Sequence, residues 1–533
     1  MTKLRANPMA ALSVLLLAMF MTLLDLTIVN IAIPQILDGL HASFDQMLWV
    51  LNAYSLLYAV LLITSARLGD IYGPRNLFAI GIAIFTVASV LSGLAQDANQ
   101  LIAARALQGL GAAVLGPQGM PLMMSLFTPD KRGGAFAAYG MTGGLAVMAG
   151  PTLGGLLVTH FGWRWIFFVN LPIGVVTLAL AFLLIPDVRP GRRHRLDLVG
   201  VAMATAGLLA VIFGLIEGQR YDWGVVAGTI TIPMIIGAGL AILAAFLYYQ
   251  SRRQRGEPLL PFAVFKDRNF TLMTLVMAAL GFAMLGFYLP LTIYMQSVLG
   301  LSAIDAGIVI AAQPLAMMFS SVAAATLLQK LHGKYLLIPG LLLFAGGVGY
   351  IDWVAQADTN RWIFLPGLIA SGIALGFVWT PVFSIATAGL KPELAGVGSG
   401  VVNTIQECGG VLAAAVIGAL LQNRLALALH DQAVAASGSL PADVRARFVD
   451  GFSQAAHSGF QVGAGQTGAG LQLPPQLEAV AHFVFTHAFV DAMRPTLLVP
   501  MVLIVLAAVA TAFARAPGTH ATIEVLTEQQ AVA

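Results

Sequence analysis

Three charged side chains lie inside long apolar stretches of the sequence, where they could bind or release protons. They are Asp25, Arg105 and Glu407. A carboxyl group in a membrane-spanning helix costs about 2.5–3.5 kcal/mol on insertion scales, and loss of water favours its neutral, protonated form. An arginine keeps its own proton, so it can only change the proton affinity of a neighbour. We therefore predict that Asp25 and Glu407 are proton-coupling residues and that Arg105 competes with a proton for Asp25.

Each of these predictions has a structural alternative. Asp25 and Arg105 fall at a similar depth in the outer half of their expected helices, so they could form a permanent ion pair that only fixes helix packing. Glu407 could be a water-facing carboxyl without a coupling role.

The composition requires these residues to be positioned by helices in lipid. Of 533 residues, 59% are hydrophobic and 10% are charged, whereas soluble domains average about 45–50% and about 25%. These values exclude a soluble enzyme, a nucleic-acid binder and a disordered scaffold. The single cysteine, Cys408, excludes an internal disulfide. The sequence contains neither a phosphate-binding P-loop nor a zinc-binding His-Glu-x-x-His motif, so we expect no metal and no cofactor.

A spanning helix needs about 20 mainly apolar residues. This window predicts an all-α polytopic membrane protein with fourteen transmembrane helices. We expect the first span to be retained, because no small-residue cleavage site follows it. The expected spans are 10–33, 47–66, 77–94, 100–122, 133–158, 165–186, 198–216, 224–249, 270–297, 305–328, 335–355, 362–389, 397–423 and 489–514.

The distribution of Lys and Arg predicts the orientation. If both termini lie in the cytoplasm, the short outer loops carry only Arg164, Arg220 and Arg361, as the positive-inside rule requires. We therefore expect a multi-pass protein of the cytoplasmic (inner) membrane. Residues 424–488 are expected to form a long outer loop, with an amphipathic helix over 441–456.

Two similar loops indicate an internal repeat. Residues 67–76 and 327–335 share a Leu and a Gly at the same spacing. Each follows the second helix of a six-helix unit if the seventh and eighth helices are set aside, and such repeats place a transport site between the halves. The predicted organisation is an amino-terminal six-helix bundle (1–186), an inserted two-helix segment (187–268) and a carboxy-terminal six-helix bundle (269–533) with the outer loop 424–488.

Motifs in the first half carry a family resemblance. They occupy residues 24–34, 67–76, 105–111, 150–155 and 163–172. Together they resemble the major facilitator superfamily, and within it the fourteen-helix drug:proton antiporters of the QacA/EmrB type. The resemblance implies the major facilitator fold and supports the proton-coupling role of Asp25. The loop motif departs from the family pattern, because Ala66 replaces a Gly and no basic residue occupies positions 71 and 74.

Further residues are expected to form the gates and the substrate cavity. In the loop a charged pair could latch one side of the protein, and in the fifth helix small residues and a proline permit close packing and bending; the alternatives are a plain turn and ordinary helix packing. The predicted gating residues are Asp70, Gly73, Arg75, Gly150, Pro151, Gly154 and Gly155. The predicted cavity residues, which could equally pack or face lipid, are Thr27, Asn30, Met141, Met148, Phe287, Tyr294, Gln296, Trp379 and Phe383.

These observations predict a proton-coupled secondary antiporter, and not an enzyme, that exports hydrophobic or cationic drugs. The alternatives are a dedicated exporter of one endogenous metabolite, lipid or antibiotic, and a non-transporting membrane sensor. The expected partners are a lipophilic small molecule, protons and the lipid bilayer, with no nucleic acid and with the chain as a monomer. A periplasmic adaptor would bind at 424–488, although no motif there marks an interface.

Overall fold

The computed structural model describes most of the chain. The described residues are 7–42, 44–128, 132–187, 197–218, 221, 223–254, 258–328, 330–390, 394–438, 445, 448, 449, 452 and 475–514. Within them, the only strands are β1 (Val225–Ala227) and β2 (Ile230–Thr231), a short antiparallel pair in which Val225 lies opposite Thr231. All other regular elements are helices.

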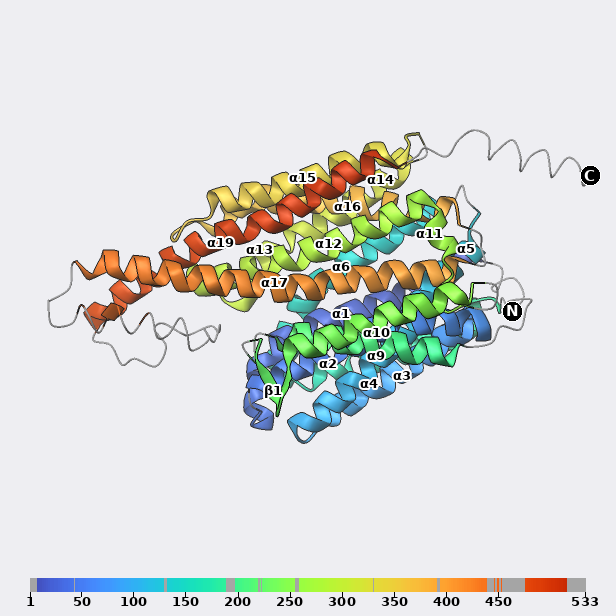
Figure 1. Cartoon of the computed structure of the whole chain (residues 1–533), viewed down its shortest axis with the longest axis horizontal. Coiled ribbons are helices and arrows are strands. Elements are labelled where there is room, and N and C mark those ends of the chain that lie inside the picture. The colour runs from blue at the N-terminus through green and yellow to red at the C-terminus, as the bar shows by residue number, and fades with distance from the viewer. Residues whose placement is uncertain are drawn as a thin grey trace, which may run out of the picture.

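Helices α1 to α8 pack on one another and form the amino-terminal group (Figure 1). Helix α1 contacts α6 and α8, and α4 packs between α2 and α3. Their bounds are α1 Pro8–Leu40, α2 Phe44–Tyr72, α3 Pro74–Leu94, α4 Ala98–Leu115, the 3-10 turn η1 Gly116–Gln118, α5 Gly119–Leu126, α6 Arg132–Phe161, α7 Trp165–Phe168 and α8 Asn170–Leu184.

A second set of helices forms the carboxy-terminal group. Helix α16 packs between α14 and α15, and α12, α17 and α19 contact one another. Their bounds are α11 Ala263–Lys266, α12 Arg268–Ile293, the π-helical turn η2 Tyr294–Val298, α13 Ala303–Ile310, α14 Ala312–Leu328, α15 Gly333–Val354, the 3-10 turn η3 Arg361–Phe364, α16 Leu365–Ala388, α17 Ala395–Ser437 and α19 Pro475–Ala512. The domain boundaries expected from the sequence stay a prediction.

Two seams join the groups. At one, α2 packs against α17, and a methyl group placed on Gly400 would lie 2.6 Å from Cβ of Ala66. At the other, α6 packs against α14, and a methyl group on Gly144 would lie 2.6 Å from the carbonyl oxygen of Pro314. Glycine at these positions lets the backbones approach closely.

Helices α9 (Leu198–Glu217) and α10 (Ile232–Arg252) form a pair that lies against the first seam. Helix α9 contacts both α2 and α17, and Leu208 and Ile212 pack in one apolar cluster with side chains of α2. Hydrogen bonds join the start of α9 to the end of α10. The carboxylate of Asp197 caps α9 at the Gly200 amide and accepts hydrogen bonds from Gln250 at 2.8 Å and Arg253 at 3.1 Å. Burial opposes the charged carboxylate, but these contacts outweigh it and lower the pKa of Asp197.

Twelve helices of the described residues are long and apolar enough to cross a membrane. The chain is therefore a multi-pass membrane protein, but the count differs from the fourteen spans expected. The expected spans 100–122 and 133–158 are absent from the twelve. Both stretches are nevertheless helical, the first as α4, η1 and α5 and the second as α6. Arg105, Gln108 and the break at η1 distinguish the first stretch from a continuous apolar helix.

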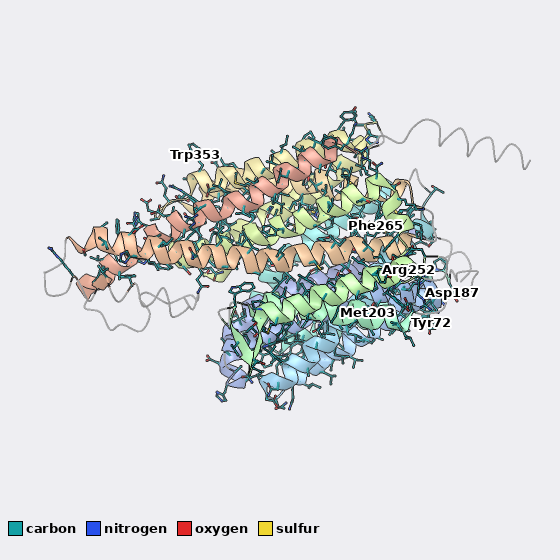
Figure 2. The ribbon with its side chains drawn as sticks, viewed as in Figure 1. Tyr72, Asp187, Met203, Arg252, Phe265 and Trp353 are labelled. Carbon is teal, nitrogen blue, oxygen red and sulfur yellow. The ribbon has the colours of Figure 1, made fainter. Side chains whose placement is uncertain are left out.

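The two ends of the bundle differ in their side chains. At one end α1 begins and α19 ends, and Tyr72 and Arg252 lie at the surface there (Figure 1 and Figure 2). Trp353 lies toward the opposite end and is 76% exposed. Exposed Tyr and Trp at both ends are typical of the two interfaces of a membrane.

Residues 424–488 were expected to form a loop. This is wrong for the two ends of that segment, which are helical. Helix α17 continues through Ser437 and has 43 residues, and α19 begins at Pro475. At 1.5 Å per residue α17 is about 65 Å long, twice the hydrocarbon thickness of about 30 Å. Both helices extend past the others (Figure 1, orange and red). Leu425, Leu429 and Ala433 recur every four residues and are buried, which explains why a polar segment stays helical. Most of the expected helix 441–456 lies outside the described residues.

Candidate proton-coupling site

Asp25 lies within α1, and its side chain is fully buried. The sequence favours a long helix here, because Asn7 caps the first turn and the residues that follow are almost all apolar. Arg105 lies in α4, which Asp97 caps, and is 1% exposed. The packing of α1, α2, α4 and α8 removes both charges from solvent and lipid.

The carboxylate of Asp25 accepts hydrogen bonds from three side chains. Nη1 of Arg105 lies 2.5 Å from Oδ2, Nε2 of Gln108 donates to Oδ1 at 2.7 Å, and Nδ2 of Asn170 donates to Oδ1 at 2.9 Å. The expectation that Asp25 and Arg105 meet is confirmed. Three donors, one of them charged, therefore hold this carboxylate in place.

Arg105 is also held by groups other than Asp25. Nη1 donates to Oε1 of Gln108 at 2.7 Å, and Nε donates to the carbonyl of Val50 at 3.3 Å. The guanidinium carbon lies 4.5 Å from the ring centre of Tyr54, in α2, a cation–π distance. Arg105 can therefore keep its position when its bond to Asp25 changes.

Asn170, at the start of α8, connects Asp25 to α3. Its Nδ2 also lies 3.0 Å from Oγ of Ser89, which donates to the carbonyl of Phe167 at 2.9 Å. Oδ1 of Asn170 is buried and has no hydrogen-bond partner among the described residues. If this amide turned over, it would present that oxygen to a protonated Asp25.

Glu407 lies in α17 and is not part of the Asp25 network. Its side chain is partly buried. Helix α17 belongs to the carboxy-terminal group and packs against α2 at the first seam. Glu407 interacts electrostatically with Tyr54 and Tyr58 of α2. The coupling roles of Asp25, Arg105 and Glu407 stay predictions.

The glycine-rich stretch of α6 contacts α1 next to Asp25. A methyl group on Gly150 would lie 2.1 Å from Oγ1 of Thr27, so a predicted gate residue and a predicted cavity residue are in contact. Gly154 and Gly155 are buried in the same helix. The side chain of Pro151 lies outside the described part of the structure.

The predicted loop gate has a different partner. Gly73 precedes α3 with a φ of +90°, a conformation that favours glycine. Nη2 of Arg75 lies 3.3 Å from Oδ2 of Asp187, beyond the end of α8. The side chain of Asp70 lies outside the described residues, so the expected Asp70–Arg75 pair stays a prediction.

The predicted cavity residues fall into different environments. Phe287 and Tyr294 are fully buried in the carboxy-terminal group, where they pack on Phe344 and Phe364, so they do not line an open space in this structure. Trp379 and Phe383 stack at 5.8 Å. Of the remaining predicted residues, Met141 and Gln296 are partly buried, and the side chains of Asn30 and Met148 are outside the described set.

The carboxy-terminal group contains its own buried polar centre, which the sequence analysis missed. The hydroxyl of Tyr288 donates to Oε1 of Gln313, whose Nε2 lies 2.9 Å from Oγ of Ser371. Gln313 and Ser371 are fully buried. This centre carries no charge. Among the described residues, no group of three or more His, Cys, Asp or Glu side chains could hold a metal.

Comparison with known proteins identifies the family. The family model described as Major Facilitator Superfamily matches residues 15–414. The chain belongs to the major facilitator superfamily. It is a multi-pass membrane transporter for small molecules and not an enzyme.

Individual relatives agree with this family. An uncharacterized MFS-type transporter of Mycobacterium tuberculosis is 38% identical over 84% of this chain and 78% of its own length. The tetracenomycin C resistance and export protein of Streptomyces glaucescens is 31% identical over 79% and 77%. Other relatives are named as multidrug transporters or multidrug resistance proteins. The crystal structure of the human organic anion transporter MFSD10 has a TM-score of 0.59 at 13% identity, and covers 93% of this chain and 99% of that chain. It supports the fold.

Two members of the site, Gln108 and Asn170, were within motifs but were given no role from the sequence. Gln108 follows Arg105 by three residues, a spacing that places both on one face of a helix. Asn170 is the first residue of α8 and lies within an apolar stretch. A polar side chain within an apolar helix was the available signal.

Proposed function

We propose that this chain is a proton-coupled antiporter that exports lipophilic, often cationic, small molecules across the cytoplasmic membrane. The observation that carries the proposal is the fully buried Asp25, hydrogen-bonded to Arg105 within the membrane-spanning bundle. Burying such a pair costs desolvation that an apolar pair would avoid. A carboxylate retained there therefore favours a function that uses its charge.

The proposal includes the finer topology. It comprises fourteen spans of the QacA/EmrB type with α9 and α10 as the inserted pair, both termini in the cytoplasm, a monomer, and no cofactor. Helices at the two stretches absent from the twelve apolar spans support this count.

The proposed cycle uses one site in two protonation states. With the site facing the cytoplasm, substrate binds while Asp25 or Glu407 is ionised; facing outward, a proton enters and substrate leaves. One pH unit supplies about 1.36 kcal/mol per proton, and a potential of 100 mV adds about 2.3 kcal/mol per charge. For a neutral substrate exchanged for one proton, together these sustain a concentration ratio of about a few hundred. Exchange of one proton for a monovalent cation moves no net charge, so one pH unit alone sustains a ratio of about ten.

Purified protein in liposomes with a trapped pH dye tests the proposal. Ethidium added to the wild type should trigger proton movement, and Asp25→Asn should abolish it. Gln313→Leu, which alters the uncharged centre, is the matched control and should retain it. If the wild type moves no protons with ethidium or with other lipophilic cations, the proposal fails.

The second candidate function is dedicated export of one endogenous product. The printed name of the relative from Streptomyces glaucescens, a resistance and export protein for tetracenomycin C, supports it. A broad panel of cations separates the two candidates: a dedicated exporter moves protons with one chemical class only, whereas a multidrug exporter moves them with unrelated lipophilic cations.

A further inference from the structure

Glu407 lies across a helix seam from the Asp25 network, at a depth that the packing fixes. Helices α2 and α17 run in opposite directions and approach closely where Gly400 meets Ala66. Glu407 lies seven residues beyond Gly400, so at the same rise per residue it should lie level with about residue 59 of α2. The neighbouring Cys408 packs on the cluster that contains Leu56 and Ala59, which agrees with this register.

Two tyrosines of α2 occupy the space between Glu407 and Arg105. The rings of Tyr54 and Tyr58 are stacked, with centres 6.2 Å apart and planes 17° apart. Arg105 lies 4.5 Å from the ring centre of Tyr54. Both hydroxyls interact electrostatically with Glu407, and that of Tyr54 also interacts with Asp25 and Arg105. The stacked pair thus lies against Arg105 and on the helix that packs against the one carrying Glu407.

The charged and titratable groups around each acid are few among the described residues. Asp25 faces Arg105 from α4 and Tyr54 from α2, with uncharged donors from α4 and α8. Glu407 faces Tyr54 and Tyr58 from α2 and has Cys408 beside it on α17; Tyr139 of α6 interacts with Tyr58. Helix α12 meets this part of α17 through Ala278 and Gly281. Among the described residues, Arg105 is the cation that contacts both Asp25 and the Tyr54 ring.

We propose that Arg105 is a positive charge shared by two acidic sites, a proton site at Asp25 and an organic-cation site at Glu407, with Tyr54 and Tyr58 as the spacer. This inference rests on the proposed proton-coupled function. While Asp25 is ionised, it neutralises Arg105, and Glu407 is able to bind a cation. When Asp25 binds a proton, the charge of Arg105 is no longer balanced, and a buried charge acts over a longer distance than one in bulk water.

The consequence is a reciprocal coupling of proton and cation. The unbalanced Arg105 repels a cation at Glu407, so protonation of Asp25 expels substrate. By linkage, a cation bound at Glu407 disfavours a proton on Asp25 by the same factor. Tyr54 acts as a positioning residue, because its ring lies against the guanidinium of Arg105.

A double-variant cycle tests the shared charge. Binding of tetraphenylphosphonium to the purified full chain in lipid nanodiscs would be measured at pH 8 for wild type, Asp25→Asn, Glu407→Gln and the double variant. Asp25→Asn leaves Arg105 unbalanced and should weaken binding about tenfold. In the Glu407→Gln background, which should itself bind weakly, Asp25→Asn should change the affinity less than about twofold.

Variants of Tyr54 supply the control for folding. Tyr54→Phe keeps the ring and should keep the tenfold effect of Asp25→Asn. Tyr54→Leu removes the ring and should reduce that effect and alter the pH dependence of binding. A merely structural role for Tyr54 would lower stability without changing the coupling.

Defined outcomes overturn the inference. Equal effects of Asp25→Asn in both backgrounds contradict the shared charge, and unchanged binding in Glu407→Gln contradicts the cation site. Absence of wild-type binding does so as well. The liposome assay separates these failures from that of the proposed function: proton movement driven by ethidium together with an additive cycle leaves the antiporter standing and rejects only the shared charge.

Discussion

The two groups of helices each bury a polar centre, but only the amino-terminal centre is charged. Asp25 and Arg105 form an ion pair that Gln108 and Asn170 complete. The carboxy-terminal centre, built on Gln313, contains only amide and hydroxyl groups. Both are buried and hydrogen-bonded, so helix packing alone does not require charge. The difference is what the proposed coupling role of Asp25 and Arg105 requires of the first centre.

The largest effect is expected for Arg105→Gln. Removing one partner of a buried ion pair costs about 3–5 kcal/mol, so the thermal unfolding temperature of the purified protein should fall by several degrees. The matched control is Arg361→Gln, which removes an exposed pair with Asp305 at 3.0 Å and should cost less than about 1 kcal/mol. Equal losses for the two variants would contradict the difference between buried and exposed pairs.

An intermediate loss of stability is expected when a glycine beside either centre is changed to alanine. Gly150 contacts Thr27 beside the charged centre, and Gly372 contacts the backbone oxygen of Gln313 at the neutral centre; an added methyl group would approach to 2.1 Å in each case. Either change to alanine should destabilise the protein by about 1–3 kcal/mol, as measured by thermal unfolding. Only Gly150→Ala should also change the pH dependence of transport.

Gly346→Ala is the control for both glycine variants, because a methyl group there meets nothing within 4 Å. It should leave stability unchanged or slightly increased. A change in the pH dependence of transport caused by Gly372→Ala would show that the centres do not differ in this respect.

The smallest effect is expected for Gln313→Leu, at about 1 kcal/mol. Ser371 keeps its hydrogen bond to the carbonyl of Leu368 at 2.9 Å, and only the contacts to Gln313 are lost. Transport should keep the pH dependence of the wild type in the liposome assay. Loss of proton coupling in this variant would place a coupling group in the carboxy-terminal centre.

The sequence predicted the charged centre better than the neutral one for a physical reason. A charge in an apolar helix is costly, so Asp25 and Arg105 were conspicuous, and their similar depth predicted that they meet. An uncharged Gln or Asn is less costly, so Gln108 and Asn170 give a weaker signal than a charge, although each is a polar side chain within an apolar stretch. The family could be predicted because its sequence motifs lie at helix contacts and in loops that the fold requires.

The sequence analysis missed the helical extensions of α17 and α19. A hydropathy window finds segments that are apolar enough to lie in lipid, and it does not detect a helix made of polar residues. Beyond residue 423 the polar residues increase, and the segment was interpreted as a loop. Apolar residues recur there every four positions, at Leu425, Leu429 and Ala433, and all three are buried. This spacing is typical of a helix and was the overlooked signal. The substrate cavity stays a prediction: Phe287 and Tyr294, which were assigned to it, are buried against other aromatic rings in this structure.

The most direct test of the central claim is infrared difference spectroscopy of the protein in lipid, recorded with and without tetraphenylphosphonium over a series of pH values. The account predicts a carboxyl band that weakens when the cation binds, because a cation at Glu407 disfavours a proton on Asp25. This band should be absent in Asp25→Asn and present in Gln313→Leu. If the same band persists in Asp25→Asn, the proton that responds to substrate lies elsewhere, and Asp25 is a packing residue.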